Sequence, residues 1–387
     1  MEILFWSIST VIVYAYFGYP IVLFLLSSVI SPTKKNETVT TKNIFYVDLI
    51  IAAYNEERVI SSKIANSLLL DYPMDHLNIW IVSDGSSDNT NSIVREYTAV
   101  KSNVHLLEYE RTGKSGVLNK AMESVSGEII VFSDANTEYS TDAIKMLVSH
   151  FKDKSVGCVS GRLYYRNPGQ TISGKGESFY WKYETTLKKM ESKIGYVAGA
   201  NGAIYAIRKN LFEPFPARTI NDDFTASMKI VMKGFKSIYE ENAKAFEDVA
   251  PTMKSEFNRH VRDGAGHYLA MVHLAGLLNP FLGKRSFIYW SHRIFRWIVP
   301  FLLIFVFIIN SFLLAKTFFL LLFTFQCIFY LLAFIGWLSI KYTTLPFFIY
   351  APFYFCNLNL ALFIGCFKIV TNMQKSTWER TERNTTE

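Results

Sequence analysis

Apolar residues concentrate at the two ends of this chain, whereas its middle part alternates apolar and polar positions. The stretch from Ile3 to Ile30 contains no Lys, Arg or Asp, and it exceeds the roughly 20 residues that cross a bilayer as a helix. A cleaved signal peptide would begin with basic residues and carry a shorter apolar run. We therefore predict a transmembrane helix at residues 1–31.

The C-terminal part contains three more apolar stretches, at about Ile298–Ala315, Thr317–Ile340 and Leu345–Val370. Before them, Trp290–Trp297 mixes aromatic side chains with His and Arg, which is typical of a segment at a membrane surface. These patterns predict an interfacial helix region at 280–297, about three transmembrane helices at 298–370 and a tail at 371–387.

Basic residues favour the cytoplasmic side of a membrane. Lys34 and Lys35 follow the first apolar stretch, and they predict that the middle of the chain is cytoplasmic in a multi-pass protein of the inner (plasma) membrane. Four spans would then place the C-terminus outside, whereas the basic residues from Lys368 onward favour the inside. A re-entrant or interfacial segment would resolve this conflict, and the sequence leaves open which segment that is.

The middle part, at residues 45–270, alternates short apolar runs with amphipathic stretches. This alternation predicts an α/β domain with a Rossmann-like, mostly parallel sheet and helices on both faces. The predicted strands are Val47–Ala53, Leu77–Val82, Val104–Glu108, Ile129–Ser133, Val156–Tyr164 and Ala203–Arg208, and the predicted helices begin near Glu56, Thr90, Ser115, Thr141, Asp222 and Met253.

Polar motifs follow three of the predicted strands. Tyr54 and Glu56 come after the first strand, Asp84 and Asp88 after the second, and Asp134-Ala135-Asn136 after the fourth. Open α/β sheets bind ligands beyond the carboxyl ends of their strands, so these side chains are candidates for a ligand site. The alternative for the acidic residues is a turn that caps the following helix.

Three further groups of residues could bind a metal ion, bind phosphate or act as a base. For the last two, a purely structural role is the alternative. Asp134 and Asn136 supply oxygen ligands that suit Mg²⁺ or Mn²⁺ together with phosphate oxygens. Lys114 lies in RTGKSG, which is either a phosphate contact or a basic loop before a helix, and which lacks the spacing of a P-loop. Asp222 and Asp223 open a helix, where carboxylates complement the helix dipole or one of them acts as a general base.

Charge and cysteine content narrow the class of protein. The net charge of +7 fits either a membrane protein with cytoplasmic basic residues or a protein that attracts anionic ligands. No Lys/Arg-rich run with interleaved aromatic residues occurs, so we expect no nucleic-acid partner. The four cysteines show no C-x-x-C spacing, which fits a reducing compartment for the soluble part.

Seven motifs in this order resemble those of family 2 glycosyltransferases with the GT-A fold: AYNEE, SDGSSDNT, RTGKSGVLN, FSDANT, GANGAIYAIRK, NDDF and RHVRD. The resemblance covers roughly Tyr46 to Tyr268, and the flanking apolar segments resemble those of cellulose, hyaluronan and poly-N-acetylglucosamine synthases. It implies an inverting, metal-dependent hexosyltransferase that moves a sugar from a nucleotide diphosphate sugar, a UDP-sugar by resemblance, to a membrane-associated acceptor in extracellular or cell-surface polysaccharide synthesis. The alternative is non-processive transfer to a polyprenyl- or other lipid-linked acceptor.

The resemblance also implies roles for individual residues. Asp223 matches the final Asp of the family's T-E-D motif, the catalytic base. Asp134, with Asn136, matches the metal motif. The implied nucleotide-sugar contacts are Tyr54, Glu56, Asp84, Lys114, Asp134 and Arg262, and the implied acceptor side consists of Gly199, Asn201, Gly202 and Asp222.

The chain departs from the family's pattern in three places. Asn136 stands where many relatives have a second Asp, and Asn221-Asp222 replaces Thr-Glu. In the Q-x-x-R-W motif, Arg259 replaces Gln and Asp263 replaces Trp, while Arg262 is retained. Because that Trp belongs to the acceptor-binding mouth of the synthases' channel, its absence disfavours processive polymerisation.

Two other classes of function compete with an enzyme. A membrane transporter with a regulatory soluble part would need charged residues deep inside its apolar stretches, and the predicted spans contain none. A catalytically inactive nucleotide-binding scaffold is opposed by the retained Asp84, Asp134, Asp223 and Arg262.

Overall fold

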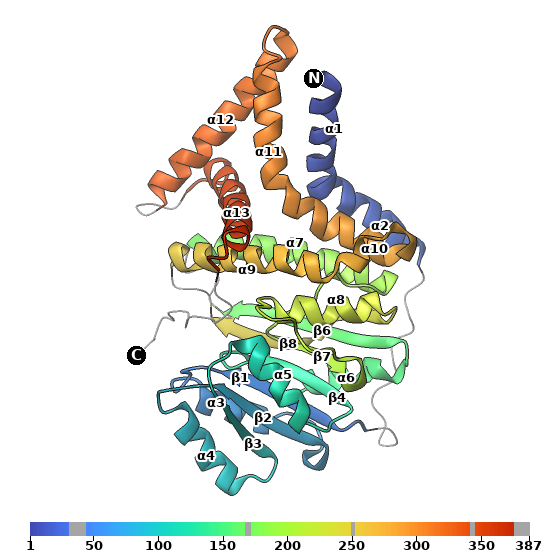
Figure 1. Ribbon diagram of the computed structural model, residues 1–387, viewed down its shortest axis with the longest axis vertical. Helices are drawn as coiled ribbons and strands as arrows, with labels where there is room; N and C mark the ends of the chain where they lie inside the picture. Colours follow the sequence, from blue (N-terminus) through green and yellow to red (C-terminus); the bar gives the residue numbers. More distant parts are fainter. Residues whose placement is uncertain (31–43, 167–171, 249–251, 341–344, 375–387) are drawn as a thin grey trace.

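The computed structural model describes residues 1–30, 44–166, 172–248, 252–340 and 345–374, with the backbone alone for 172–180. The expectations for Lys34, Lys35 and the basic tail beyond residue 374 lie outside the described residues. The protein has three layers: a sheet with its flanking helices, a layer of helices above it, and a group of long apolar helices on top (Figure 1).

A single eight-stranded sheet has the order β3-β2-β1-β4-β7-β6-β8-β5. The first four strands are parallel neighbours: β1 (Val47–Ala53), β2 (Leu77–Asp84), β3 (Val104–Tyr109) and β4 (Ile129–Asp134). The other half of the sheet is mixed, with β7 antiparallel to both β4 and β6, β6 parallel to β8, and β5 antiparallel to β8. Its strands are β5 (Glu138–Tyr139), β6 (Val156–Arg166), β7 (Tyr205–Arg208) and β8 (Lys236–Asp248).

Helices cover both faces of the parallel half, which explains why β1 is buried at every position. Leu49 and Ile51 face a core shared with α3 (Ile60–Leu68), α4 (Thr90–Val100) and α6 (Ala143–Ser149). Ile50 and Ala52 face the opposite core, shared with α5 (Lys114–Ser124) and α8 (Asp222–Met232). The apolar run of β1 therefore supplies two cores with alternate side chains.

The middle layer contains α7 (Ile172–Ile194) and α9 (Met253–His273), which lie between α8 and the long apolar helices (Figure 1). Small residues let α9 approach α13 (Phe347–Val370) closely, because a Cβ atom at Gly365 would lie 2.6 Å from the Ala265 nitrogen. The sequence analysis predicted neither α7 nor β8. Short 3-10 segments occur at Met74–His76, His150–Lys152, Lys209–Leu211, Ala275–Leu278 and Pro280–Leu282.

Among the described residues, four helices are long and apolar enough to cross a membrane: Glu2–Val29, Lys284–Ser311, Thr317–Ser339 and Phe347–Val370. The first consists of α1 (Glu2–Val13), a π-helical turn and α2 (Tyr19–Val29), and the third and fourth are α12 and α13.

The second of these helices, here called the 284–311 helix, joins α10 (Lys284–Ile288), a π-helical segment and α11 (Phe295–Ser311) without a break. The sequence analysis set a boundary between residues 297 and 298, and this boundary falls inside the helix. His292 and Trp297 are buried because they pack against α7 and α8 of the sheet domain.

Candidate active site

The loops after β1 and β2 are joined by hydrogen bonds at the carboxyl edge of the sheet. Asn55 adopts a left-handed conformation (φ 54°), and its side-chain oxygen accepts a bond of 2.8 Å from the Ser87 amide. Asp88 accepts from the Thr90 amide at 3.0 Å, so it forms the turn that opens α4. The two loops thus hold each other, and Asp88 forms a turn just before α4, whose N-cap residue Asn89 makes no capping bond through its side chain.

Tyr54 and Glu56 lie in the same pair of loops. The Arg111 guanidinium stacks on the Tyr54 ring at 3.8 Å from the ring centre. The Glu56 side chain is buried, and its backbone amide donates to Thr90 Oγ1 at 2.8 Å. Tyr54 therefore lies beside the loop that follows β3, and Glu56 lies beside the start of α4.

Asp84, at the end of β2, holds the loop that leads into α5. Its Oδ1 accepts hydrogen bonds from the backbone amides of Thr112 at 2.7 Å and Gly113 at 3.1 Å. Burial raises the pKa of Asp84, although these amides work in the opposite direction. Gly113 has a φ of 88°, which favours glycine, and the next residue, Lys114, begins α5. Asp84 therefore positions Lys114 through the backbone.

Lys114 joins two of the predicted site residues. Its Nζ lies 2.8 Å from Asp134 Oδ1, at the end of β4, and 3.4 Å from Asp222 Oδ2, at the start of α8. Burial opposes its charge, but the two carboxylates raise the pKa of Lys114 well above its ordinary value. A permanent positive charge thus lies between segments that are far apart in the sequence.

Asp223 follows Asp222 at the start of α8. Burial, and then the neighbouring Asp222 carboxylate, raise the pKa of Asp223 to about 6. A carboxylate with such a pKa is ionised near neutral pH and accepts a proton more readily than an ordinary Asp. Asp223 therefore has the protonation behaviour of a general base.

The loop from Gly199 to Gly202 packs against the start of α8. A Cβ atom at Gly199, where φ is 99°, would lie 2.4 Å from the Phe224 ring, and one at Gly202 would lie 3.2 Å from Asp223 Oδ2. Asn201 is buried, and its side-chain oxygen accepts from the Ala203 amide at 3.3 Å. The two glycines therefore bring the loop against Asp223, with Asn201 shaping the loop itself.

Asn136 points away from Lys114 and toward β8. Its side-chain amide donates to Glu247 Oε1 at 2.7 Å. No group of three or more His, Cys, Asp or Glu side chains within the described ranges lies close enough together to hold a metal ion. Asp134 and the Asn136 oxygen still suit a divalent cation that takes most of its ligands from phosphate oxygens and water.

Arg262 lies on α9, where its guanidinium is 3.6 Å from the Asp263 carboxylate. Within the described residues, Arg262 forms no hydrogen bond or ion pair with Asp84, Lys114 or Asp134. Its helix does reach the site, because the Asn221 side-chain amide donates to the Asp263 carbonyl at 3.0 Å. α9 thus docks two residues before Asp223.

Two groups near the site, the buried Lys63 and the half-buried Glu247, were not predicted from the sequence. Lys63 donates to Ser133 Oγ and to the Thr137 carbonyl, each at 2.7 Å, and so supports the turn that carries Asp134. Burial lowers the pKa of Lys63 to about 7. A lysine among the polar positions of a short helix gives no sequence signal of this kind, nor does Glu247 on a strand that was not predicted.

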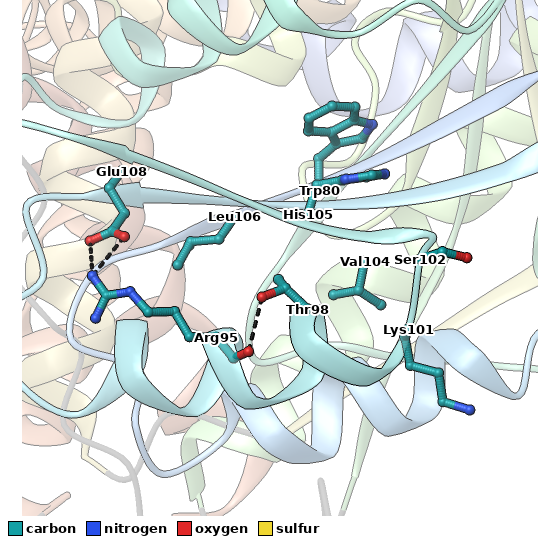
Figure 2. Close-up of a pocket in the computed structure, with 9 residues that line it drawn as sticks. All are labelled: Trp80, Arg95, Thr98, Lys101, Ser102, Val104, His105, Leu106 and Glu108. Carbon is teal, nitrogen blue, oxygen red and sulfur yellow. Dashed lines mark hydrogen bonds and ion pairs between the residues drawn. The ribbon is translucent and has the colours of Figure 1, made fainter.

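A hollow of about 470 Å³ lies elsewhere, between α4 and the edge strand β3 (Figure 2). Trp80 and His105 stack on one side of it, and the exposed ion pair of Arg95 and Glu108, at 2.7 Å, lies on the other. It is lined by none of Asp84, Lys114, Asp134 and Asp223. The candidate site is therefore the carboxyl edge of the sheet, and not this hollow.

Part of the chain is similar to a known protein family. The profile of glycosyl transferase family 2 matches residues 48–213. The chain is 27% identical over 191 residues to a beta-monoglucosyldiacylglycerol synthase of Trichormus variabilis, and 26% identical over 225 residues to a poly-beta-1,6-N-acetyl-D-glucosamine synthase of Staphylococcus aureus. These matches cover 48% and 57% of this chain, but only 41% and 54% of the relatives, so the chain spans about half their length.

A solved structure shares the fold over nearly the whole chain. It is a mannosyltransferase from Pyrobaculum calidifontis in complex with GDP-Man and Mn²⁺, with a TM-score of 0.69, 20% identity, and coverage of 96% of this chain and 100% of that chain. This likeness, together with the family profile, confirms the predicted α/β GT-A fold with long apolar helices. Residues 48–213 of the chain thus match glycosyl transferase family 2, in agreement with the resemblance of the sequence motifs.

Proposed function

We propose that this protein is an inverting glycosyltransferase that moves a sugar from a nucleotide diphosphate sugar, a UDP-sugar by resemblance, to an acceptor at the membrane. One observation carries the proposal: Lys114 joins Asp134 to Asp222, directly beside Asp223 and the Gly199–Gly202 loop. A cation for the leaving diphosphate and a base for the acceptor hydroxyl thus lie at one edge of a family 2 domain.

In the proposed reaction, Asp223 accepts the proton of an acceptor hydroxyl. The oxygen attacks the anomeric carbon of the donor from the side opposite the diphosphate, the bond between that carbon and the diphosphate oxygen breaks, and the anomeric configuration inverts. Lys114 lies where it stabilises the negative charge that the departing nucleotide diphosphate gains. The Gly199–Gly202 loop, with Asp222 behind it, forms the acceptor side.

A divalent cation, Mg²⁺ or Mn²⁺, is part of the proposal. Asp134 and the Asn136 side-chain oxygen would hold it, and it would neutralise the diphosphate of the donor. The mannosyltransferase of similar fold, which was solved with GDP-Man and Mn²⁺, supports this choice of cofactor. Tyr54, Glu56, Asp84 and Arg262 are proposed as further contacts of the nucleotide sugar.

The acceptor divides the proposal into two versions. One relative is named for a product on diacylglycerol and the other for a polysaccharide, so both a lipid-linked and a polymeric acceptor are compatible with the family. Asp263, which stands where processive synthases have Trp, favours transfer of single sugars to a polyprenyl- or other lipid-linked acceptor. Four long apolar helices support a location in a membrane. A cytoplasmic side for the sheet domain is supported only by the basic residues Lys34 and Lys35 in the sequence.

The test is a panel of radiolabelled donors, including UDP-glucose, UDP-N-acetylglucosamine and GDP-mannose, with membranes that contain the protein and either Mn²⁺, Mg²⁺ or EDTA. We expect one donor to label a product, and EDTA to abolish labelling. Extraction into organic solvent identifies a lipid-linked product, whereas retention at the origin of a chromatogram identifies a polymer. Membranes with Asp223→Asn are the matched control, and equal labelling by that variant would refute the assignment of the base.

A further inference from the structure

A buried polar cluster lies between the sheet domain and the long apolar helices. On α7, Glu184 and Glu191 are seven positions apart and so face the same side of the helix. His292 of the 284–311 helix is fully buried between them, with Nδ1 2.5 Å from Glu191 Oε1 and Nε2 3.2 Å from Glu184 Oε2. These contacts join segments that are about a hundred residues apart in the chain, at separations of 101 and 108 residues.

Two further residues, Arg296 and Tyr19, contact the carboxylates of this cluster. Arg296 Nη1 lies 2.7 Å from Glu184 Oε1, and the Tyr19 hydroxyl, on the N-terminal helix, donates to Glu191 Oε1 at 2.6 Å. Burial alone would raise the pKa of Glu191, but His292 and the Ala198 amide lower it below its ordinary value. The carboxylates are therefore charged and matched by basic partners, as buried ions must be.

This cluster holds the backbone of one residue of the sheet domain, Ala198, through both its amide and its carbonyl. The Ala198 amide donates to Glu191 Oε2 at 2.9 Å. The Ala198 carbonyl accepts two bonds from Arg293, from Nε at 2.9 Å and from Nη2 at 2.5 Å. Ala198 directly precedes the Gly199–Gly202 loop that packs against Asp223 and Phe224. The backbone just before the acceptor-side loop is thus fixed by a helix of the candidate membrane group.

We infer that Glu191 and Arg293 are positioning residues for sugar transfer, which clamp Ala198 and thereby fix the acceptor-side loop beside Asp223. The inference rests on the proposed function and extends it. Neither side chain lies in the donor half of the site, so the clamp acts on the transfer step and not on nucleotide binding. A displacement of about 1 Å in such a loop lowers a reaction rate by about a hundredfold.

The same helix offers a matched control. Arg285 donates from Nη1 to the carbonyls of Val231 at 3.4 Å and Met232 at 3.0 Å, at the C-terminal end of α8. Arg285 and Arg293 are therefore both arginines of one helix that bind backbone carbonyls of the sheet domain. They differ in that only Arg293 binds next to the acceptor-side loop.

The experiment compares purified Arg293→Lys, Glu191→Ala, Glu191→Gln and Arg285→Lys with the unaltered protein in lipid nanodiscs. Three quantities are measured: kcat for transfer, the Kd of the nucleoside diphosphate of the active donor, and amide hydrogen exchange at residues 198–202. For Arg293→Lys we expect kcat to fall about 10- to 100-fold, Kd to stay within about twofold, and exchange at 198–202 to accelerate. Glu191→Gln should lose less than Glu191→Ala, since its amide oxygen still accepts from Ala198, and Arg285→Lys should change none of the three.

Two results would overturn the inference. The first is an unchanged kcat in Arg293→Lys and Glu191→Ala. The second is a loss of kcat accompanied by weaker nucleotide binding and faster exchange throughout the domain, which would mean a structural role only. If the unaltered protein transfers no sugar from any donor, the proposed function fails instead. Exchange at 198–202 then tests the clamp by itself, and equal protection in Arg293→Lys and the unaltered protein would refute it.

Discussion

The parallel half of the sheet and the helices that face the apolar group use charged residues in opposite ways. Asp84 in the first region accepts hydrogen bonds from amides of a nearby loop, 28 and 29 residues along the chain. Glu184 and Glu191 in the second region are buried against His292, Arg293 and Arg296, more than a hundred residues away. The proposed donor half of the site is therefore organised by its own backbone, whereas the proposed acceptor half depends on a helix distant in sequence.

Asp223 lies where the two regions meet, and its substitution should lower kcat more than any other change proposed here. We expect Asp223→Asn to lower kcat by about 10²- to 10⁴-fold, because the amide cannot accept the proton of the acceptor hydroxyl. Binding of the nucleotide should persist, as measured by titration calorimetry. Asp222→Asn is the comparison, and it should lower kcat less than Asp223→Asn does, since Asp222 pairs with Lys114 and is not the proposed base. The reverse pattern would exchange the roles of the two carboxylates.

Lys114→Met tests whether the donor half depends on the charge that Asp84 positions. The variant leaves the Asp134 and Asp222 carboxylates without their shared cation and removes a positive charge from the diphosphate site. We expect donor binding to weaken by about 2 kcal/mol, or roughly 30-fold in Kd. Lys120→Met, on the same helix and over the Tyr109 ring, is the control and should stay within about twofold. Equal losses in both variants would argue against a specific role for Lys114.

The pH dependence separates the function of Asp223 from its effect on stability. Since its pKa is raised to about 6, kcat should fall about tenfold for each pH unit below 6. Stability should change in the opposite direction, because the native carboxyl binds a proton that the unfolded chain releases between pH 4 and 6. Ionisation of Asp223 therefore lowers the stability of the folded state more as pH rises from 4 to 6. Melting temperatures should show Asp223→Asn gaining stability relative to the unaltered protein from pH 4 to pH 7, and a constant difference would contradict the raised pKa.

Gly195 and Gly199 differ in the space that a side chain would have beside them. Gly195 and Gly199 have the same φ of 99°, but a Cβ at Gly195 would meet Lys236 Cγ at 3.5 Å, an ordinary contact, whereas one at Gly199 would clash with Phe224. Gly199→Ala should therefore lower the free energy of unfolding by about 1 kcal/mol more than Gly195→Ala. Denaturation of both variants measures the difference. Equal losses would show that the loop has room to move away from α8.

The smallest effect is expected at the hollow of Figure 2, which belongs to the first region but not to the site. Arg95 and Glu108 are exposed, so their ion pair is screened by water. Arg95→Ala should change the free energy of unfolding by less than about 0.5 kcal/mol and leave kcat unchanged. A measurable loss of sugar transfer in this variant would show that the hollow contributes to the reaction.

The first region could be predicted from the sequence because its central strands, β1 and β4, are buried on both faces and read as apolar runs. β1 spans Val47–Ala53, as predicted, and the helix predicted from Thr90 begins there. The site motifs fall at strand ends, so position along the chain indicates position in space. Only short shifts occur, such as the helix expected near Glu56, which begins at Ile60.

The second region could not be predicted in the same way. β8 alternates buried and exposed positions only in part, since bulges shift its register against β6, and α7 carries Glu184, Lys188 and Glu191 on a buried face. Acidic and basic residues at such positions read as a solvated surface when the partner helix is unknown. The cluster around Ala198 was missed for this reason, because pairing over a hundred residues leaves no local pattern.

The continuity of the 284–311 helix limits where this protein can be shortened for purification. A shortened version that stops before Lys284, designed to be purified without detergent, would strip Glu184 and Glu191 of their basic partners and remove the arginine that binds the end of α8. Two buried anions would then face water or each other. A shortened version that keeps these contacts must extend at least through Arg296. It therefore retains the first part of the apolar 284–311 helix, which the chosen detergent or buffer must keep in solution.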